Sequence, residues 1–165
     1  MRDSFVKFGK SINIAEIGVA AAENAIEMLN NFPLAKFYLI DSYDVNHTTF
    51  QFQTKKFTDR EREEFIDEVR EKLSPFDNRY ELIIEDSVVA SRRFPDNFFD
   101  YIYIDAQHEL NFVLIDLFTW YPKLKPGGMF AGHDIGIDGV KDALARFFGS
   151  GWVQSHDDWY ITKRL

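Results

Sequence analysis

The 165-residue chain contains no cysteine, and this absence limits its chemistry. It excludes disulfide bonds, thiolate metal sites and a cysteine nucleophile, and it fits a reducing compartment, so we expect a cytoplasmic protein. The start of the sequence has no apolar run of signal length, and no segment approaches the ~18 apolar residues of a membrane span. We therefore expect no membrane partner.

Positive charge is scarce as well. There are 19 basic and 27 acidic residues, which gives a net charge of −8 with histidine neutral. Proteins that grip nucleic acid through its phosphates carry a basic patch or stripe. Here the basic pairs Arg92-Arg93 and Lys163-Arg164 are too short to form one. The sequence therefore predicts no nucleic-acid partner.

Apolar residues, in contrast, are abundant. They make up 45% of the chain and include 17 phenylalanines, a composition that favours a folded domain over disorder. We predict a single domain over residues 1–165, with a short lead-in at 1–10. The long aromatic-rich segment at 42–57 is predicted to be a lid or binding loop, because loops of that length are often functional.

Apolar strands alternate with amphipathic helices along the chain. The predicted strands are 12–17, 36–41, 80–85, 99–105 and 129–132, followed by a hairpin of 152–156 and 159–163. The predicted helices are 22–30, 58–73, 88–93, 109–124 and 139–148. A capping box at Thr58 and Glu61 begins the second helix, and Lys125-Pro126-Gly127-Gly128 is predicted to be a turn. This alternation indicates the α/β class, with a seven-stranded, mostly parallel sheet that carries helices on both faces and ends in an antiparallel hairpin.

Polar residues follow the ends of the predicted parallel strands. They are Glu16 with Gly18, Asp41, Asp86-Ser87, Asp105, and His133-Asp134. Since the carboxyl ends of parallel strands lie along one edge of a sheet, we expect these residues to meet in one crevice. A single aspartate there would be weak evidence, because aspartate is a common turn former. The same position on five strands indicates a binding site.

Four motifs give the pattern a family resemblance: Glu16-Ile17-Gly18, Asp105-Ala106-Gln107-His108 with Asp116 further on, Leu124 to Gly128, and His133-Asp134-Ile135. From Asn13 to Lys163 the chain resembles the class I S-adenosylmethionine-dependent methyltransferases, and among these the small-molecule O-methyltransferases. The resemblance implies a Rossmann-like fold, S-adenosylmethionine as cofactor, and methyl transfer to a hydroxyl of a small molecule, with or without Mg²⁺ or Mn²⁺.

The resemblance also implies roles for individual residues. The implied cofactor-binding positions are Glu16, Gly18 and Ala20 at the methionine part, Asn24 at its carboxylate, Asp41 at the ribose, Asp86 and Ser87 at the adenine, and Asp105 and Ala106 after the fourth strand. The implied metal ligands are Asp105, His133 and Asp134. The implied catalytic residues are His108 as base, with Asp105 and His133; in metal-free relatives a histidine base acts alone.

Each of these positions also has a structural interpretation. Asp41 and Asp86-Ser87 are typical of turns and helix caps, and His133-Asp134 could be a plain loop. The second glycine of the turn is replaced by Ala22, which is tolerated only if its φ angle is negative. The alternatives are therefore an interaction domain without catalysis, an N-methyltransferase, or a metal-dependent oxygenating relative. The helices that usually cover the acceptor are missing, which makes a homodimer plausible.

Overall fold

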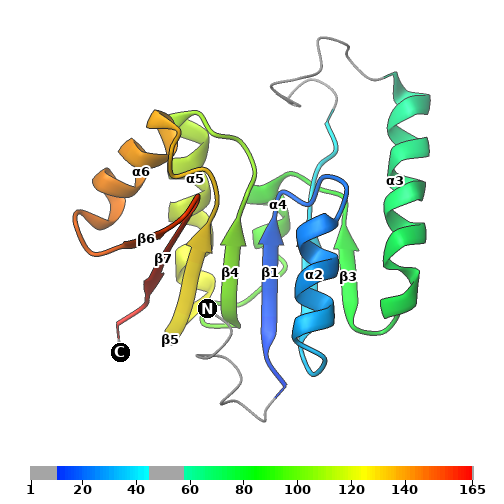
Figure 1. The fold of residues 1–165 in the computed structure, drawn as a ribbon, viewed down its shortest axis with the longest axis horizontal. Coiled ribbons are helices and arrows are strands. Elements are labelled where there is room, and N and C mark those ends of the chain that lie inside the picture. The colour runs from blue at the N-terminus through cyan, green and yellow to red at the C-terminus, as the bar shows by residue number, and fades with distance from the viewer. Residues whose placement is uncertain (1–10, 45–57, 165) are drawn as a thin grey trace.

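The computed structural model describes residues 11–44 and 58–164; the lead-in and most of the predicted lid loop lie outside the described residues. In the described part, seven strands form one sheet in the order β3-β2-β1-β4-β5-β7-β6 (Figure 1). The strands are β1 (Asn13–Ile17), β2 (Lys36–Ile40), β3 (Tyr80–Ile83), β4 (Phe99–Ile104), β5 (Leu124–Gly132), β6 (Val153–Ser155) and β7 (Asp158–Thr162). Strands β1 to β5 pair in parallel, whereas β7 pairs antiparallel with both β5 and β6, as the sequence predicted.

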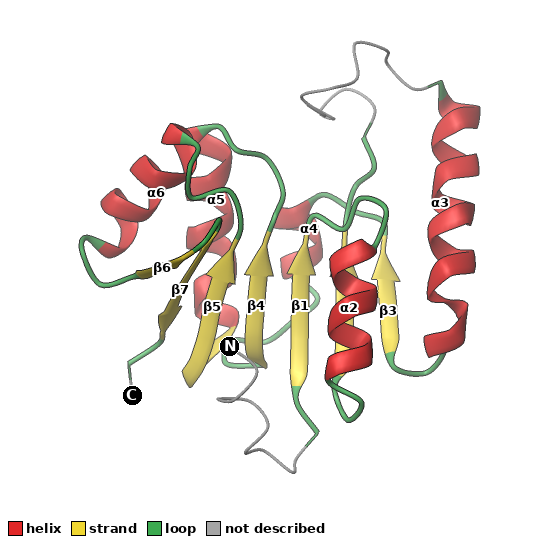
Figure 2. Ribbon diagram, viewed as in Figure 1, coloured by secondary structure: helices red, strands yellow, loops and turns green. Residues whose placement is uncertain are grey.

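Helices cover both faces of the sheet (Figure 2). They are α2 (Glu23–Asn31), α3 (Asp59–Leu73), α4 (Ser87–Ser91), α5 (Leu110–Trp120) and α6 (Asp138–Phe148), with short 3₁₀ turns η1 (Ser74–Phe76) and η2 (Tyr121–Lys123). One apolar core lies between the sheet and α2 and α3, and the other between the sheet and α4, α5 and α6. None of the described helices is long and apolar enough to cross a membrane.

The strands are apolar on both sides because both of their faces are buried. Ile14 packs into the core beside α2, and its neighbour Ala15 packs into the opposite core, as the alternation of side chains in a strand requires. The predicted capping box of α3 is confirmed: Thr58 Oγ1 accepts from the Glu61 amide, and Glu61 Oε2 accepts from the Thr58 amide.

Two predicted boundaries were wrong. Residues Lys125–Gly128 are not a free turn but belong to β5, because the Gly127 amide donates to the Lys163 carbonyl and the Lys163 amide donates to Gly128, at 2.8 and 2.9 Å. Helix α5 ends at Trp120 rather than at 124, and a 3₁₀ turn with Pro122 follows. Proline has no amide to continue the helical hydrogen bonds, so the α-helix stops before it.

Candidate functional site

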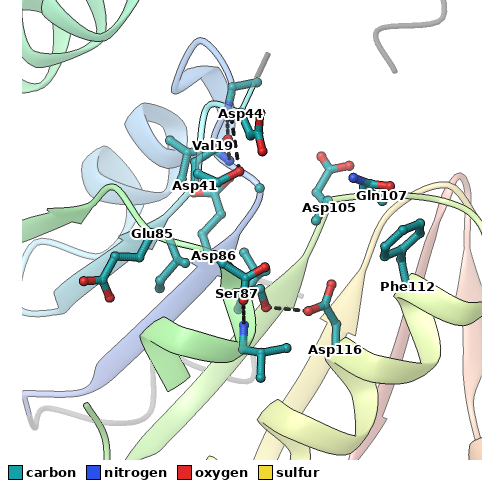
Figure 3. Close-up of a pocket in the computed structure, with 18 of the residues that line it drawn as sticks. Val19, Asp41, Asp44, Glu85, Asp86, Ser87, Asp105, Gln107, Phe112 and Asp116 are labelled. Carbon is teal, nitrogen blue, oxygen red and sulfur yellow. Dashed lines mark hydrogen bonds between the residues drawn. The ribbon is translucent and has the colours of Figure 1, made fainter. Parts of the chain in front are cut away.

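A cavity of about 600 Å³ lies at the carboxyl ends of the central strands, a size typical of small-molecule sites. Its walls come from the segments that follow β1, β2, β3 and β4, with one side formed by α5 (Figure 3). All nine residues predicted to bind the cofactor line this cavity: Glu16, Gly18, Ala20, Asn24, Asp41, Asp86, Ser87, Asp105 and Ala106. The residues that the sequence predicted to meet in one crevice therefore do line a single cavity.

Gly18 is required by the backbone of the turn. Its φ is +88°, and a Cβ atom at this position would lie 2.0 Å from the carbonyl oxygen of Asp105. Strands β1 and β4 are adjacent, so the first turn passes directly against the chain that leaves β4. Only a residue without a side chain fits between them.

The condition for Ala22, a negative φ, is not met. Ala22 has φ +64° and Ala20 has φ +46°, so two alanines adopt the left-handed conformation. For a residue with a Cβ this conformation costs roughly 1–2 kcal/mol. Ala22 is held there as the N-cap of α2, with its amide donating to the Val19 carbonyl at 2.8 Å. The turn is thus strained but well anchored.

Asp41 stabilises this turn through hydrogen bonds to its backbone. Its Oδ2 accepts hydrogen bonds from the amides of Val19 (Figure 3) and Ala20, both at 2.9 Å. Its Oδ1 accepts from the Tyr43 amide at 2.8 Å. A carboxylate has about four lone-pair positions, so this aspartate retains capacity for a further donor. Its turn-forming interpretation is confirmed, and its ribose role stays a prediction.

Glu16 lies at the bottom of the site and is 1% exposed. Its Oε1 accepts from Asn24 Nδ2 at 2.9 Å, whereas its Oε2 has no hydrogen-bond partner among the described residues. Burial raises the pKa of Glu16 to about 8; the bond from Asn24 opposes this rise, and Asp105 and Asp41 add to it. Glu16 is therefore largely protonated at neutral pH in the free protein.

The side chains of the residues after β3 make more hydrogen bonds within the protein than the sequence indicated. Asp86 Oδ1 accepts from the amides of Val88 and Val89, at 2.9 and 3.1 Å, so its capping interpretation is confirmed. Ser87 Oγ donates a short hydrogen bond to Asp116 Oδ1 and accepts from Trp120 Nε1 at 2.8 Å. These contacts fix both side chains in the cavity wall, and their adenine role stays a prediction.

Asp116 itself was quoted as a motif residue but not predicted to line the site. The signal was present, because an aspartate is unusual in the apolar run of α5. The other lining residues that the sequence did not indicate as site residues are Ile17, Val19, Glu23, Ile40, Ser42, Asp44, Glu85, Val88, Gln107, Phe112 and Ile115.

A second group of polar side chains lies beside the cavity. Ligand atoms of Asp105, His108 and Asp134 lie within 4.8 Å of one another, and His108 Nε2 is 2.7 Å from Asp134 Oδ2, in an ion-pair contact outside hydrogen-bond geometry. The metal set predicted from the sequence contained His133 in place of His108. His133 adjoins this group, with its Nδ1 3.3 Å from Asp134 Oδ1.

The charges of this group influence one another. Burial raises the pKa of Asp105; His133 opposes the rise, and Asp134 adds to it. Burial lowers the pKa of His133, but Asp105 and Asp134 raise it by more, so the net direction is upward. The group therefore favours a bound positive charge, either a proton or a cation.

A seven-stranded sheet of this order, with a cavity at its carboxyl edge and a terminal antiparallel pair, defines a Rossmann-like α/β fold. Residues 15–135 match a family model described as a methyltransferase domain, so the chain belongs to this family of class I S-adenosylmethionine-dependent methyltransferases.

Solved structures show the same fold. A precorrin-6y C5,15-methyltransferase from Geobacter metallireducens is 14% identical with a TM-score of 0.66, over 99% of this chain and 86% of that one. A putative caffeoyl-CoA O-methyltransferase from Staphylococcus aureus is 17% identical with a TM-score of 0.65, over 93% and 76%. A spermidine synthase from Thermotoga maritima is 19% identical with a TM-score of 0.59, over 94% and 54%. No curated protein sequence matches the chain.

Proposed function

We propose that the protein transfers a methyl group from S-adenosylmethionine to a hydroxyl of a small molecule that carries no negative charge, with His108 as the base. The single observation that carries this proposal is the contact of His108 with Asp134 at the edge of the cavity that holds the predicted cofactor residues. The base, its carboxylate partner and the cavity therefore lie within one site.

The residues of the cavity fit the cofactor. Glu16 Oε2 is buried and has no partner among the described residues, and Asp41 and Asp105 line the same cavity. A ligand with a positive sulfonium and an ammonium group would favour the ionised form of Glu16 and compensate the charges of Asp41 and Asp105. When bound, the cofactor supplies an electrophilic methyl group, while the protein supplies proximity and orientation.

His108 can act as a general base because of its position. Asp134 Oδ2 lies 2.7 Å from Nε2 of the ring and restricts its orientation. A neutral imidazole nitrogen is an acceptor that can take the proton of an acceptor hydroxyl. Removal of that proton makes the oxygen a better nucleophile for the methyl group.

The same side chains also fit a divalent cation. Asp105 and Asp134 would supply oxygen ligands and His108 or His133 a nitrogen, a mixed set that suits Mn²⁺ better than Mg²⁺. A cation there would lower the pKa of a bound hydroxyl. If His108 were a ligand through Nε2, it could not serve as the base through that atom. The two mechanisms therefore make different predictions for a chelator.

The charge of the cavity limits the acceptor. Eight acidic residues line it, and among the described lining residues there is neither lysine nor arginine. Phosphate and coenzyme A groups are anionic and would be repelled. A neutral phenol or sugar is favoured; an amine is the second candidate, because an acidic cavity attracts an ammonium group, and it would make the reaction an N-methyl transfer.

The test is a methyl-transfer assay with S-adenosylmethionine labelled in its methyl group. The acceptor panel should contain phenols, sugars, their phosphate esters and amines, each with and without EDTA. We expect methylated neutral hydroxyl compounds, loss of rate in His108→Ala, and full activity in the control His156→Ala, whose side chain is exposed on the hairpin turn.

The outcomes separate the mechanisms. Activity that survives EDTA but not His108→Ala supports the base, whereas activity abolished by EDTA and restored by Mn²⁺ supports the cation site. A wild-type rate in His108→Ala would exclude both roles for this residue. Exclusive methylation of phosphate esters would contradict the proposed acceptor class.

A further inference from the structure

Asp116 is a buried acid in the cavity wall that the assignments above do not use. We propose that its Oδ2 recognises the 6-amino group of the adenine ring, so that Asp116 makes the site specific for aminopurines. This inference rests on the proposed use of S-adenosylmethionine and assigns one part of that ligand to one side chain. It gives a binding role to a motif residue that the sequence did not assign to the site.

The position of the carboxylate is fixed by two neighbours. Asp116 is 5% exposed, and its Oδ1 accepts the hydrogen bond from Ser87, whose oxygen is in turn held by Trp120. Figure 3 shows Asp116 extending from α5 toward Ser87 at the wall of the cavity. Its Oδ2 accepts no hydrogen bond from the described residues, so one oxygen of a fixed carboxylate remains available to a ligand.

The other acceptors in this part of the cavity are already engaged. Both oxygens of Glu85 pair with Arg93, and Ser87 uses its proton on Asp116. Asp86 caps α4 and is exposed, so a hydrogen bond to its second oxygen competes with water. Asp116 is the better-shielded acceptor, and hydrogen bonds are stronger where water is excluded.

The surroundings of Asp116 fit a flat aromatic ring. Phe112 lies one helical turn before it on the same face of α5, and Val88 and Ile115 line the same cavity. Phe112 and Ile115 are 42% and 46% exposed, so a ligand in the cavity can reach their apolar side chains. An acceptor beside apolar side chains suits a ring with an amino group on its edge.

The charge of Asp116 determines whether the site prefers a 6-aminopurine or a 6-oxopurine. Burial raises the pKa of Asp116 to about 6, the bond from Ser87 opposes this rise, and Asp86 adds to it. At pH 8 the carboxylate is therefore ionised and can only accept. A 6-oxopurine would place its carbonyl oxygen against this acceptor, and such a mismatch can cost a factor of roughly 10² or more in affinity.

The experiment compares two ligands that differ at the Watson–Crick edge of the purine: the 6-amino group becomes a carbonyl, and N1 gains a proton. S-adenosylhomocysteine and S-inosylhomocysteine are titrated into the wild-type protein by calorimetry at pH 8, and then into Asp116→Asn. We expect the wild type to bind the adenosyl ligand roughly 10²-fold more tightly. In Asp116→Asn, Ser87 can still donate to the amide oxygen, which leaves the amide nitrogen as a donor. The preference should then disappear or reverse.

The controls distinguish recognition from structure. Asp142→Asn changes an exposed acid on α6 and should keep the wild-type preference. If Asp116 only supported the fold, Asp116→Asn would weaken the binding of both ligands equally and keep the ratio of their affinities. That result would overturn the inference. Equal binding of both ligands by the wild type would overturn it without any variant. Binding of neither ligand would refute the proposed function itself.

Discussion

Replacing Glu16 by glutamine should make the ligand-free protein more stable at alkaline pH. Glutamine keeps an oxygen for the hydrogen bond from Asn24 and has nearly the same volume, but it cannot ionise. The ordinary pKa of the glutamate is 4.5, and in the folded protein burial raises it to about 8. Between these two values the folded protein keeps a proton that the unfolded chain has lost, so folding stability falls as the pH rises across this window.

The size of the effect follows from the same values. A difference between 4.5 and about 8 corresponds to at most about 5 kcal/mol, fully lost only above about pH 8. Domains of this size are stable by roughly 5–15 kcal/mol, so a part of this effect is measurable. Asp116 also titrates in this range, but it is present in both proteins and cancels in the difference.

Urea unfolding followed by circular dichroism at pH 6 and pH 9 measures the difference directly. We expect Glu16→Gln to gain stability relative to the wild type as the pH rises, by a few kcal/mol between these two conditions. Glu23→Gln, an exposed acid in the same turn, is the matched control and should show no such trend. A stability difference for Glu16→Gln that stayed constant with pH would refute the account of the buried acid.

Four further variants test the turn and the capping box by thermal unfolding. Gly18→Ala places a Cβ against the Asp105 carbonyl and should cost about 3 kcal/mol or more and abolish cofactor binding; near-wild-type stability would show that the turn can move. Ala20→Gly should raise stability by up to about 1 kcal/mol, because it removes left-handed strain; a loss would contradict that strain. Thr58→Ala should cost about 1 kcal/mol and Thr58→Ser little, and equal losses would argue against the cap.

The elements of this fold could be predicted because their signals are local. Buried strands are short apolar runs, and the capping box is a four-residue pattern at Thr58. The convergence of Glu16, Asp41 and Asp105 could also be predicted, since parallel topology places strand ends at one edge. These inferences need only the order of the elements.

The wrong predictions depended on distant partners. Residues Lys125–Gly128 join β5 because Lys163 pairs with them from the other end of the domain, and no local pattern shows this. His133 as a metal ligand stays a prediction; that His108 also joins Asp105 and Asp134 depends on how two loops meet, which no local pattern shows.

The central claim is that the cavity beside Gly18 binds the cofactor, and calorimetry with S-adenosylhomocysteine tests it most directly. We predict saturable binding of one ligand per chain to the wild type, and no heat of binding for Gly18→Ala, whose added Cβ would push the turn against Asp105. Absence of binding to the folded wild-type protein at millimolar ligand, or undiminished binding to Gly18→Ala, would contradict the account.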